Sequence, residues 1–531
     1  MPQNHGSPRQ LIIPLALAVF AAALAVWFSY PAPALPLDDA YIHLTFARNL
    51  ADGHGFAFNP GERSLGFTSP LWVCTLALLD RLGADPEPAA RLLGILAAGA
   101  GCAVFSLLVR SSLKPTGSRA RFAAVAGFAL ALSGNLIWLS ASGMETSLYL
   151  SLSLLAILLL RTDHPRPVPG GIVLGLAVLA RPTGFLLAII LIAALALSRK
   201  TRPTLAAASA LLLVSAPWLI YSFASTGFWL PPTRAGKLAS NLANSGLSPE
   251  GISRFLSRHL VYFWQVDLDI LAFFLLAGGA GLVALRRRLA ERPTDRSGPL
   301  LAPSPAALLA VWALLDLLMH AVFFRSTAYT TPMHYLRYSA MLIPAAIALA
   351  TIGLGRLAAN ASEAAGAFLF SLLLVPLAVE CSRVPAWRSL YLQHTSQIFH
   401  EHRAAALYIR DQLPGDARVA CLDIGALGYF SGRHIIDLGG LTDPDILLDL
   451  ADRNVGKYLV RRHATHYLEM VRHDSERIVG VRADDGRLYR LEFIRAWHFP
   501  AYVSPLLLHS LGMNLYEVQP LPEPHSGSES P

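Results

Sequence analysis

Residues 11–30 read LIIPLALAVFAAALAVWFSY, an apolar run near the start of the chain. A helix of about 20 such residues is long enough to cross the hydrocarbon core of a bilayer. The following Ala32-Pro33-Ala34 weakly resembles a signal-peptidase site, but the run is longer than a typical signal core and more apolar segments follow. We therefore predict an uncleaved membrane anchor.

The composition of the whole chain points the same way. Of its 531 residues, 54% are hydrophobic and only 15% are charged, whereas a soluble globular protein carries about 25% charged residues. The same apolar richness excludes a disordered chain. The net charge is +8, an excess that in a membrane protein is typical of cytoplasmic loops and of contacts with lipid phosphates. No phosphate-binding glycine loop or RNA-binding signature is present, so no nucleic-acid partner is expected.

The distribution of basic residues predicts the topology. Short cytoplasmic loops are enriched in Lys and Arg, and the basic clusters alternate between apolar runs if the N-terminus is cytoplasmic and residues 168–198 cross the membrane twice. A break at Arg181-Pro182-Thr183-Gly184 supports two short spans there, because Pro and Gly end helices. The prediction is eleven spans, namely 11–30 and ten more at roughly 88–109, 122–140, 146–160, 168–180, 184–198, 204–223, 267–285, 303–323, 339–354 and 364–380.

The predicted fold is a polytopic α-helical membrane protein with a C-terminal soluble α/β domain on the outer face. Residues 1–380 form the membrane domain, with outer loops at 31–91 and 226–267, and residues 381–531 form the outer domain with a disordered tail. In the outer domain we expect an amphipathic helix over 399–413 and strands at 418–422, 434–437 and 516–518. Cys381 and Cys421 share this oxidising side, so a disulfide can form, but free thiols are the favoured interpretation.

The first outer loop carries the most informative polar residues. Asp38 and Asp39 are adjacent at the start of a helical pattern, and His43 shares a face with Asp39 at spacing i, i+4. Ile42, Phe46 and Leu50 form an apolar stripe suited to lying on the membrane. The aspartates can simply cap the helix. Alternatively, a carboxylate at this height can serve as a general base for an attacking hydroxyl or bind a divalent cation.

Other charged residues lie where the topology does not require them. Basic residues at outer ends of spans can hold a lipid phosphate or extend to headgroups; they are Arg181, Arg234, Lys237, Arg325 and Arg337. Glu145, in a tight outer turn, is either a helix N-terminal acid or a site carboxylate. Asp316 and His320 lie four apart inside a predicted span, as a functional or a structural pair. His54 and His334 can join a metal site, but no ligand spacing supports zinc.

Several short motifs resemble a known family. Asp38-Asp39-Ala40-Tyr41-Ile42, followed by the segments 47–50 (ARNL), 53–55 (GHG) and 58–62 (FNPGE), resembles the first periplasmic loop of GT-C glycosyltransferases. The likeness is greatest to the bacterial branch that includes mycobacterial arabinofuranosyltransferases. Protein O-mannosyltransferases and the aminoarabinose transferases of lipid A are more distant. Further matches occur at 142–146 (SGMET), 181–184 (RPTG), 230–233 (LPPT) through Lys237, 334–338 (HYLRY), 423–429 (DIGALGY) and 437–444 (DLGGLTDP).

This resemblance implies an enzyme that uses a polyprenyl-phosphate-linked sugar, with the catalytic carboxylate in the first outer loop. Asp38 is the preferred base and Asp39 the alternative. The predicted substrate-binding residues are His43, Glu145, Arg181, Lys237, His334 and Arg337. Thr183 and Pro232 depart from the family pattern, which often has Glu and Asn there, so no role of those side chains is transferred.

The predicted enzyme is a multi-pass protein of the cell membrane, with its N-terminus in the cytoplasm and its C-terminal domain outside. Its acceptor is a glycan, a lipid or a protein. The sugar, the prenyl chain and the need for a divalent cation remain open. A lipid or sugar transporter or flippase is the alternative, supported only by Asp316 and His320, because no internal repeat is found. A scaffold that binds envelope polymers leaves the paired aspartates unexplained.

Overall fold

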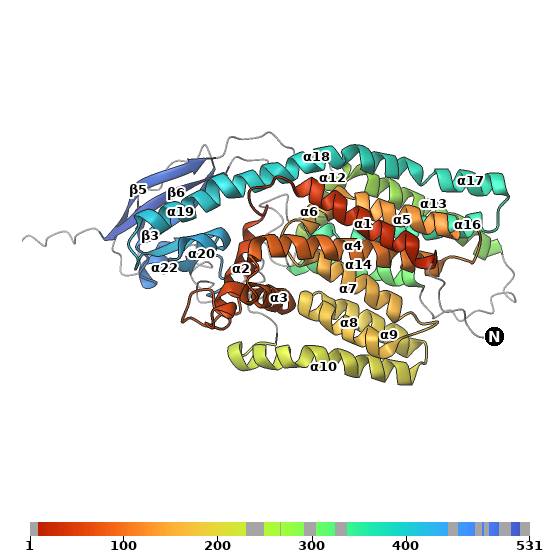
Figure 1. Cartoon of the computed structure of the whole chain (residues 1–531), viewed down its shortest axis with the longest axis horizontal. Coiled ribbons are helices and arrows are strands. Elements are labelled where there is room, and N and C mark those ends of the chain that lie inside the picture. Colours follow the sequence, from red (N-terminus) through yellow and green to blue (C-terminus); the bar gives the residue numbers. More distant parts are fainter. Residues whose placement is uncertain are drawn as a thin grey trace, which may run out of the picture.

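The computed structural model describes residues 9–229, 249–265, 267–290, 304–323, 337–443, 446, 455–472, 480–482, 488–498 and 511–520. Within these ranges the protein is a bundle of apolar helices with a mixed α/β domain at one end (Figure 1).

Each of the eleven predicted spans contains a helix. Among the described residues, seven helices are long and apolar enough to cross a membrane, or eight if α5 and α6, which meet at 61°, count as one broken span. The helices α7, α8 and α9 have 14 residues each and are shorter than a usual span. The number of eleven therefore stays a prediction. The bundle helices are α1 (Arg9–Ser29), α4 (Pro86–Ser112), α5 (Arg119–Leu132), α6 (Gly134–Ser140), α7 (Thr146–Leu159), α8 (Pro167–Ala180), α9 (Gly184–Leu197), α10 (Thr201–Thr226), α12 (Pro249–Gln265), α13 (Leu268–Ala290), α14 (Pro305–Phe323), α16 (Leu342–Ala358), α17 (Glu363–Ser371) and α18 (Leu374–Ile398).

The predicted break between residues 180 and 184 is confirmed. Helix α8 ends at Ala180, Arg181 has an extended backbone, and α9 begins at Gly184. The two helices come so close at the break that a Cβ on Gly184 would lie 2.7 Å from the carbonyl oxygen of Ala177. The break therefore turns the chain back at Arg181 and leaves that cation between two helix ends.

The first outer loop folds into two helices, α2 (Asp38–Ala51) and α3 (Pro70–Arg81). The expectation that the stripe of α2 lies on the membrane is wrong. Ile42 and Phe46 are buried in protein and Leu50 is partly buried, with the Phe46 ring 4.8 Å from the Phe67 ring. An apolar stripe has the same spacing whether lipid or protein covers it, so the pattern alone does not separate the two.

The C-terminal domain is a six-stranded mixed sheet in the order β2-β1-β3-β6-β5-β4. Strand β1 pairs in parallel with β2 and β3, and β6 lies antiparallel between β3 and β5. The strands predicted at 418–422, 434–437 and 516–518 coincide with β1, β2 and β6, and the predicted helix with α19. The elements are β1 (Arg418–Cys421), β2 (His434–Asp437), β3 (His466–Arg472), β4 (Gly480–Arg482), β5 (Leu488–His498), β6 (Leu511–Pro520), α19 (Ala404–Gln412), α20 (Gly425–Ser431) and α22 (Val455–Arg461).

A long helical segment connects the two parts of the protein. Helix α18 continues through a π-helical turn at Phe399–Arg403 into α19, and Figure 1 shows it running from the bundle into the sheet domain. The predicted domain boundary at 381 falls inside α18. Cys381 is exposed and Cys421 is buried, and both are free thiols.

Candidate functional site

Asp38 is held by the C-terminal α/β domain, which we call the outer domain after its predicted side of the membrane. Its two carboxylate oxygens each accept one backbone N–H, from Gly425 and from Ala426, both at 2.7 Å. A side chain at position 425 does not fit, because its Cβ would lie 1.9 Å from the Asp38 carbonyl oxygen. The close approach of α2 thus explains why the 423–429 motif has a glycine at position 425.

The surroundings of Asp38 make it an unusually strong carboxylate base. Burial, and next the neighbouring Asp423 carboxylate, raise the pKa of Asp38 to about 7. His402 and the two backbone hydrogen bonds lower it by less. A general base works best when its pKa lies near the working pH, so this carboxylate suits proton abstraction near neutrality.

Asp39 has a different partner. Its Oδ2 lies 2.5 Å from a terminal nitrogen of Arg337, which enters from the start of the segment leading into α16. The Asp39 side chain is 41% exposed, whereas that of Arg337 is only 13% exposed. Within the described part of the chain, the buried Nε of Arg337 donates to no acceptor. Asp39 therefore orients Arg337, whose Nε stays available to a ligand.

Glu145 connects α2 to the break between α8 and α9. Its Oε2 lies 3.9 Å from Nδ1 of His43, and its Oε1 lies 3.8 Å from Nε of Arg181. Both separations exceed hydrogen-bond length, and neither Nδ1 of His43 nor Oε2 of Glu145 has a hydrogen-bond partner among the described residues. Burial lowers the pKa of His43, so its ring is neutral at pH 7. Nδ1 of His43 and Oε2 of Glu145 can therefore form hydrogen bonds with a ligand.

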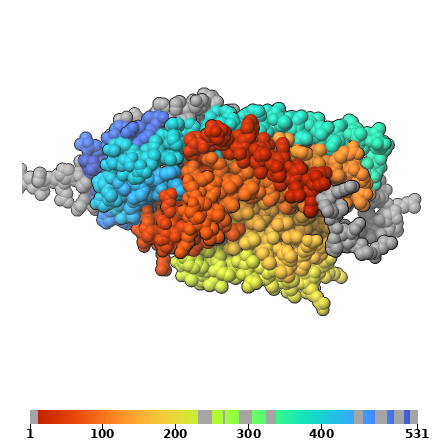
Figure 2. Space-filling model, viewed as in Figure 1, coloured from red at the N-terminus to blue at the C-terminus, as the bar shows by residue number. Residues whose placement is uncertain are grey.

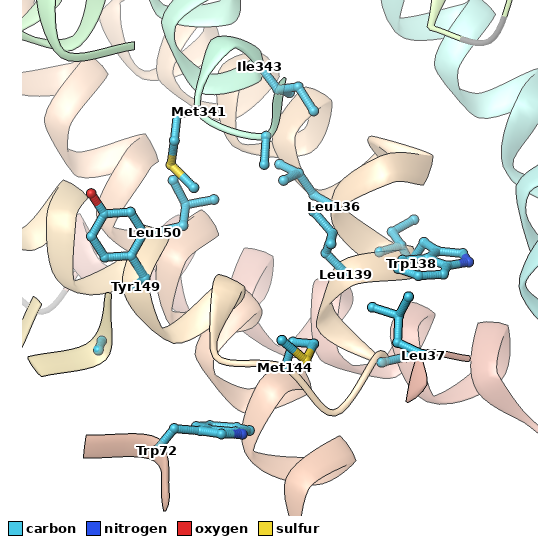
Figure 3. Close-up of a cluster of buried hydrophobic side chains, with 14 of the residues drawn as sticks. Leu37, Trp72, Leu136, Trp138, Leu139, Met144, Tyr149, Leu150, Met341 and Ile343 are labelled. Carbon is cyan, nitrogen blue, oxygen red and sulfur yellow. The ribbon is translucent and has the colours of Figure 1, made fainter. Parts of the chain in front are cut away.

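The turn that carries Glu145 is held in place by Gly143 and Trp72. Gly143 has a φ of +77°, a backbone conformation that favours glycine, and its carbonyl accepts a hydrogen bond from Trp72 at 3.1 Å. Figure 3 shows Trp72, Met144 and Leu37 from three segments packed around this turn. The buried apolar contacts therefore hold the carboxylate in place.

The structure joins five of the eight predicted site residues in two neighbouring groups, Asp39 with Arg337, and Glu145 with His43 and Arg181. Asp38, the sixth, instead contacts the backbone of Gly425 and Ala426. Lys237 and His334 lie outside the described residues, as do Arg234 and Arg325. Asp316 and His320 are buried next to each other, with 3.4 Å between Oδ2 and Nδ1. His54 is exposed, and the described ranges contain no group of three or more His, Cys, Asp or Glu that could hold a metal.

Sequence reasoning missed two residues beside Asp38. Nε2 of His402 lies 3.2 Å from Oδ2 of Asp423, and both act electrostatically on Asp38. Asp423 belongs to the 423–429 motif, but the motif predicts no role for its side chain. His402 carries no local signal, because only the fold brings it to a residue more than 360 positions earlier.

Other motif residues of the first loop also contact the outer domain. The side-chain amide of Asn59 donates to the Ile435 carbonyl at 2.9 Å and accepts from the Ile435 N–H at 3.0 Å. Arg48 donates to the Tyr429 carbonyl at 2.8 Å, with its guanidinium 3.7 Å from the Tyr429 ring centre. Figure 2 shows the outer domain packed directly against the first loop. Motifs far apart in the sequence therefore form one interface.

Comparisons with known proteins agree with this architecture. Residues 67–302 match the model of glycosyltransferase family 87, and residues 390–516 match a domain of unknown function, DUF8728. Among solved structures, ArnT from Cupriavidus metallidurans bound to undecaprenyl phosphate is similar at a TM-score of 0.54 and 13% identity, over 88% of this chain and 94% of that one. Arabinofuranosyltransferase AftD from Mycobacteria is similar at a TM-score of 0.51 and 17% identity, over 97% of this chain and 40% of that one. A comparison with curated proteins gives no match.

The chain therefore has the GT-C fold, with apolar spanning helices and a sheet domain at one end. Residues 67–302, which include part of the helical bundle, carry the match to glycosyltransferase family 87. The fold implied by the resemblance of the sequence motifs is confirmed.

Proposed function

We propose that this protein transfers a sugar from a polyprenyl-phosphate donor to an acceptor hydroxyl at the outer face of the cell membrane. The observation that carries the proposal is the placement of two cations beside α2, which also holds Asp38: Arg337 pairs with Asp39, and the buried Arg181 lies near Glu145. The similar ArnT structure holds undecaprenyl phosphate, which supports a donor of this class.

Asp38 acts as the general base. Each of its oxygens uses one lone pair for a backbone N–H, and a carboxylate oxygen has two, so a substrate hydroxyl can still be accepted. Its pKa of about 7 makes it a better base than an ordinary aspartate. The neighbouring Asp39 is already occupied by Arg337, and its role is to orient that cation.

Arg337 and Arg181 hold the donor phosphate. Arginine binds phosphate through several parallel N–H donors, and Arg337 keeps a buried Nε without an acceptor in the described residues. Arg181 is buried, and its ion-pair distance to Glu145 is 3.8 Å, which leaves room for a closer anion. Lys237 and His334, which the resemblance also assigns to the substrate, complete the proposed set.

In the proposed reaction the acceptor oxygen attacks the anomeric carbon while Asp38 takes its proton. The bond between the anomeric carbon and the phosphate oxygen breaks, and its electron pair leaves on the polyprenyl phosphate. The two arginines stabilise that charge. One displacement inverts the anomeric centre. The acceptor is a cell-envelope glycan, a glycolipid or a protein.

The test is a transfer assay with the full-length protein in lipid nanodiscs. The donors are decaprenyl-phosphoryl arabinofuranose, undecaprenyl-phosphoryl aminoarabinose and polyprenyl-phosphoryl mannose, and released polyprenyl phosphate is measured. In parallel, envelope glycans and glycolipids of cells with the wild type or Asp38→Asn are compared by mass spectrometry. We expect a product that Asp38→Asn abolishes and that the control Asp411→Asn keeps, since Asp411 is exposed on α19, where it pairs with its neighbour Arg410. Full transfer by Asp38→Asn, or lipid movement without transfer by the wild type, contradicts the proposal.

A further inference from the structure

His402 and Asp423 form a buried pair in the outer domain that the reaction above does not use. His402 lies in the π-helical turn between α18 and α19 and is 6% exposed. Its Nε2 contacts Oδ2 of Asp423 at 3.2 Å, while its buried Nδ1 has no hydrogen-bond partner in the described ranges. π-helical turns inside helices are frequent at functional sites.

The pair is adjacent to the proposed base. Asp423 lies two residues before Gly425, whose N–H binds the Asp38 carboxylate at 2.7 Å. Asp38, Asp423 and His402 act on one another electrostatically, and the Cys421 thiol at the end of β1 also interacts with Asp38. On its own helix the nearest charged neighbour of Asp38 is Asp39, which is paired with Arg337. The outer domain therefore supplies three of the groups that surround Asp38.

We propose that the outer domain completes the active site of the proposed glycosyltransferase, with His402, held by Asp423, as a positioning residue that keeps Asp38 ionised. This inference rests on the proposed function. The carboxylates of Asp423, Asp38 and Glu401 all act on this ring, which therefore retains its proton, because nearby opposite charges favour the charged form. The imidazolium then stabilises the Asp38 anion, and Asp423 fixes the orientation of the ring.

The proposal predicts opposite effects of two substitutions. His402→Gln removes a positive charge that lowers the pKa of Asp38, so that pKa rises. Asp423→Asn removes the carboxylate that, after burial, does most to raise the pKa of Asp38, so that pKa falls even though the ring loses its partner. Each shift should be about one pH unit, within the usual range for a nearby charge. A general disturbance of packing has no reason to give shifts of opposite sign.

The first experiment measures the ionisation of the Asp38 carboxyl and does not depend on sugar transfer. The Asp38 carboxyl of the full-length protein is titrated by infrared difference spectroscopy, and its band is assigned by its loss in Asp38→Asn. We expect the midpoint to rise in His402→Gln, to fall in Asp423→Asn and to stay in place in the control His400→Gln, whose exposed ring lies in the same turn. Equal midpoints in all four proteins, or shifts of the same sign, overturn the inference.

The second experiment links the pair to transfer. Activity requires ionised Asp38, so the acidic limb of the kcat/KM profile should move up by about one pH unit in His402→Gln and down in Asp423→Asn. Undecaprenyl-phosphate affinity, unchanged within about twofold, shows that each variant is folded. If the wild type transfers no sugar but the infrared shifts appear, the proposed function is wrong, while the electrostatic effect of His402 and Asp423 on Asp38 is confirmed. If the wild type is active but the profiles differ only in height, His402 and Asp423 are merely structural.

Discussion

Asp38 and Asp39 are neighbours in the chain, yet their side chains meet different partners because successive residues of a helix point about 100° apart. Asp38 faces the backbone amides of the outer domain, and Asp39 faces Arg337 in the membrane part. The sequence predicted that one aspartate is catalytic, but it contained no information on which one binds which partner. That distinction depends on Arg337, which lies 298 positions after Asp39, and on Gly425, which lies 387 positions after Asp38.

Substitutions of the two aspartates should therefore change different kinetic constants. Asp38→Asn is expected to lower kcat by a factor of about 10²–10⁴, the usual contribution of a general base, with little change in the donor KM. Asp39→Asn should mainly raise the donor KM, because Arg337 loses the carboxylate that orients it. Steady-state kinetics with a varied donor concentration separate the two effects. A normal kcat in Asp38→Asn, together with a collapsed kcat in Asp39→Asn, would reverse the assignment.

The raised pKa of Asp38 predicts the pH dependence of the wild type. The carboxyl must be deprotonated to accept a proton, and its pKa is about 7. Activity is therefore lost as the pH falls through about 7, well above the range of an ordinary aspartate near 4. A kcat/KM profile of the purified protein gives the midpoint directly. A profile that stays flat down to about pH 5 would contradict the role of Asp38, since an ordinary carboxylate remains ionised there.

At the level of elements, α2 and α20 form the contact that joins the first outer loop to the outer domain. The helical pattern of α2 and the strands β1 and β2 could be predicted from the sequence, because they depend on local periodicity. The covering of the α2 stripe by protein could not, because hydrophobic spacing does not identify the neighbour. The glycines of the 423–429 motif carry this information indirectly, since Gly425 and Gly428 leave no room for a side chain against Asp38 and Phe58.

Gly425→Ala tests this contact between elements. The added Cβ would lie 1.9 Å from the Asp38 carbonyl oxygen and 2.8 Å from its Oδ2, so α20 must move away from α2. We expect a loss of about 1–3 kcal/mol from overpacking, seen as a lower Tm, and at least a tenfold loss of transfer. Gly415→Ala is the matched control, because its Cβ would meet no atom within 4 Å. Equal Tm and activity in the two variants would show that the contact does not matter.

At the scale of the whole molecule, two connections fix the outer domain over the membrane part. One is the helical segment from α18 to α19, which packs on α5, α6 and α13 in the bundle. The other is the interface between the first loop and the outer domain. Composition alone predicted both parts, because charged and apolar residues separate along the chain. Their mutual arrangement could not be predicted, since the predicted boundary falls inside one helix.

The basic loops predict the orientation of the whole molecule, and thiol labelling tests this prediction. Asp416→Cys places a thiol in the exposed turn after α19, and Thr116→Cys places one in the exposed connection between α4 and α5. With the four native cysteines replaced, a membrane-impermeant maleimide on intact cells should label only the thiol at position 416. The thiol at 116 should react after permeabilisation, because the loop that contains it carries the basic residues typical of the cytoplasmic side. The opposite pattern would invert the topology and place Asp38 on the cytoplasmic face. A polyprenyl-phosphate donor would then have to present its sugar on that side, and the proposed reaction would fail even if every contact around Asp38 were correct.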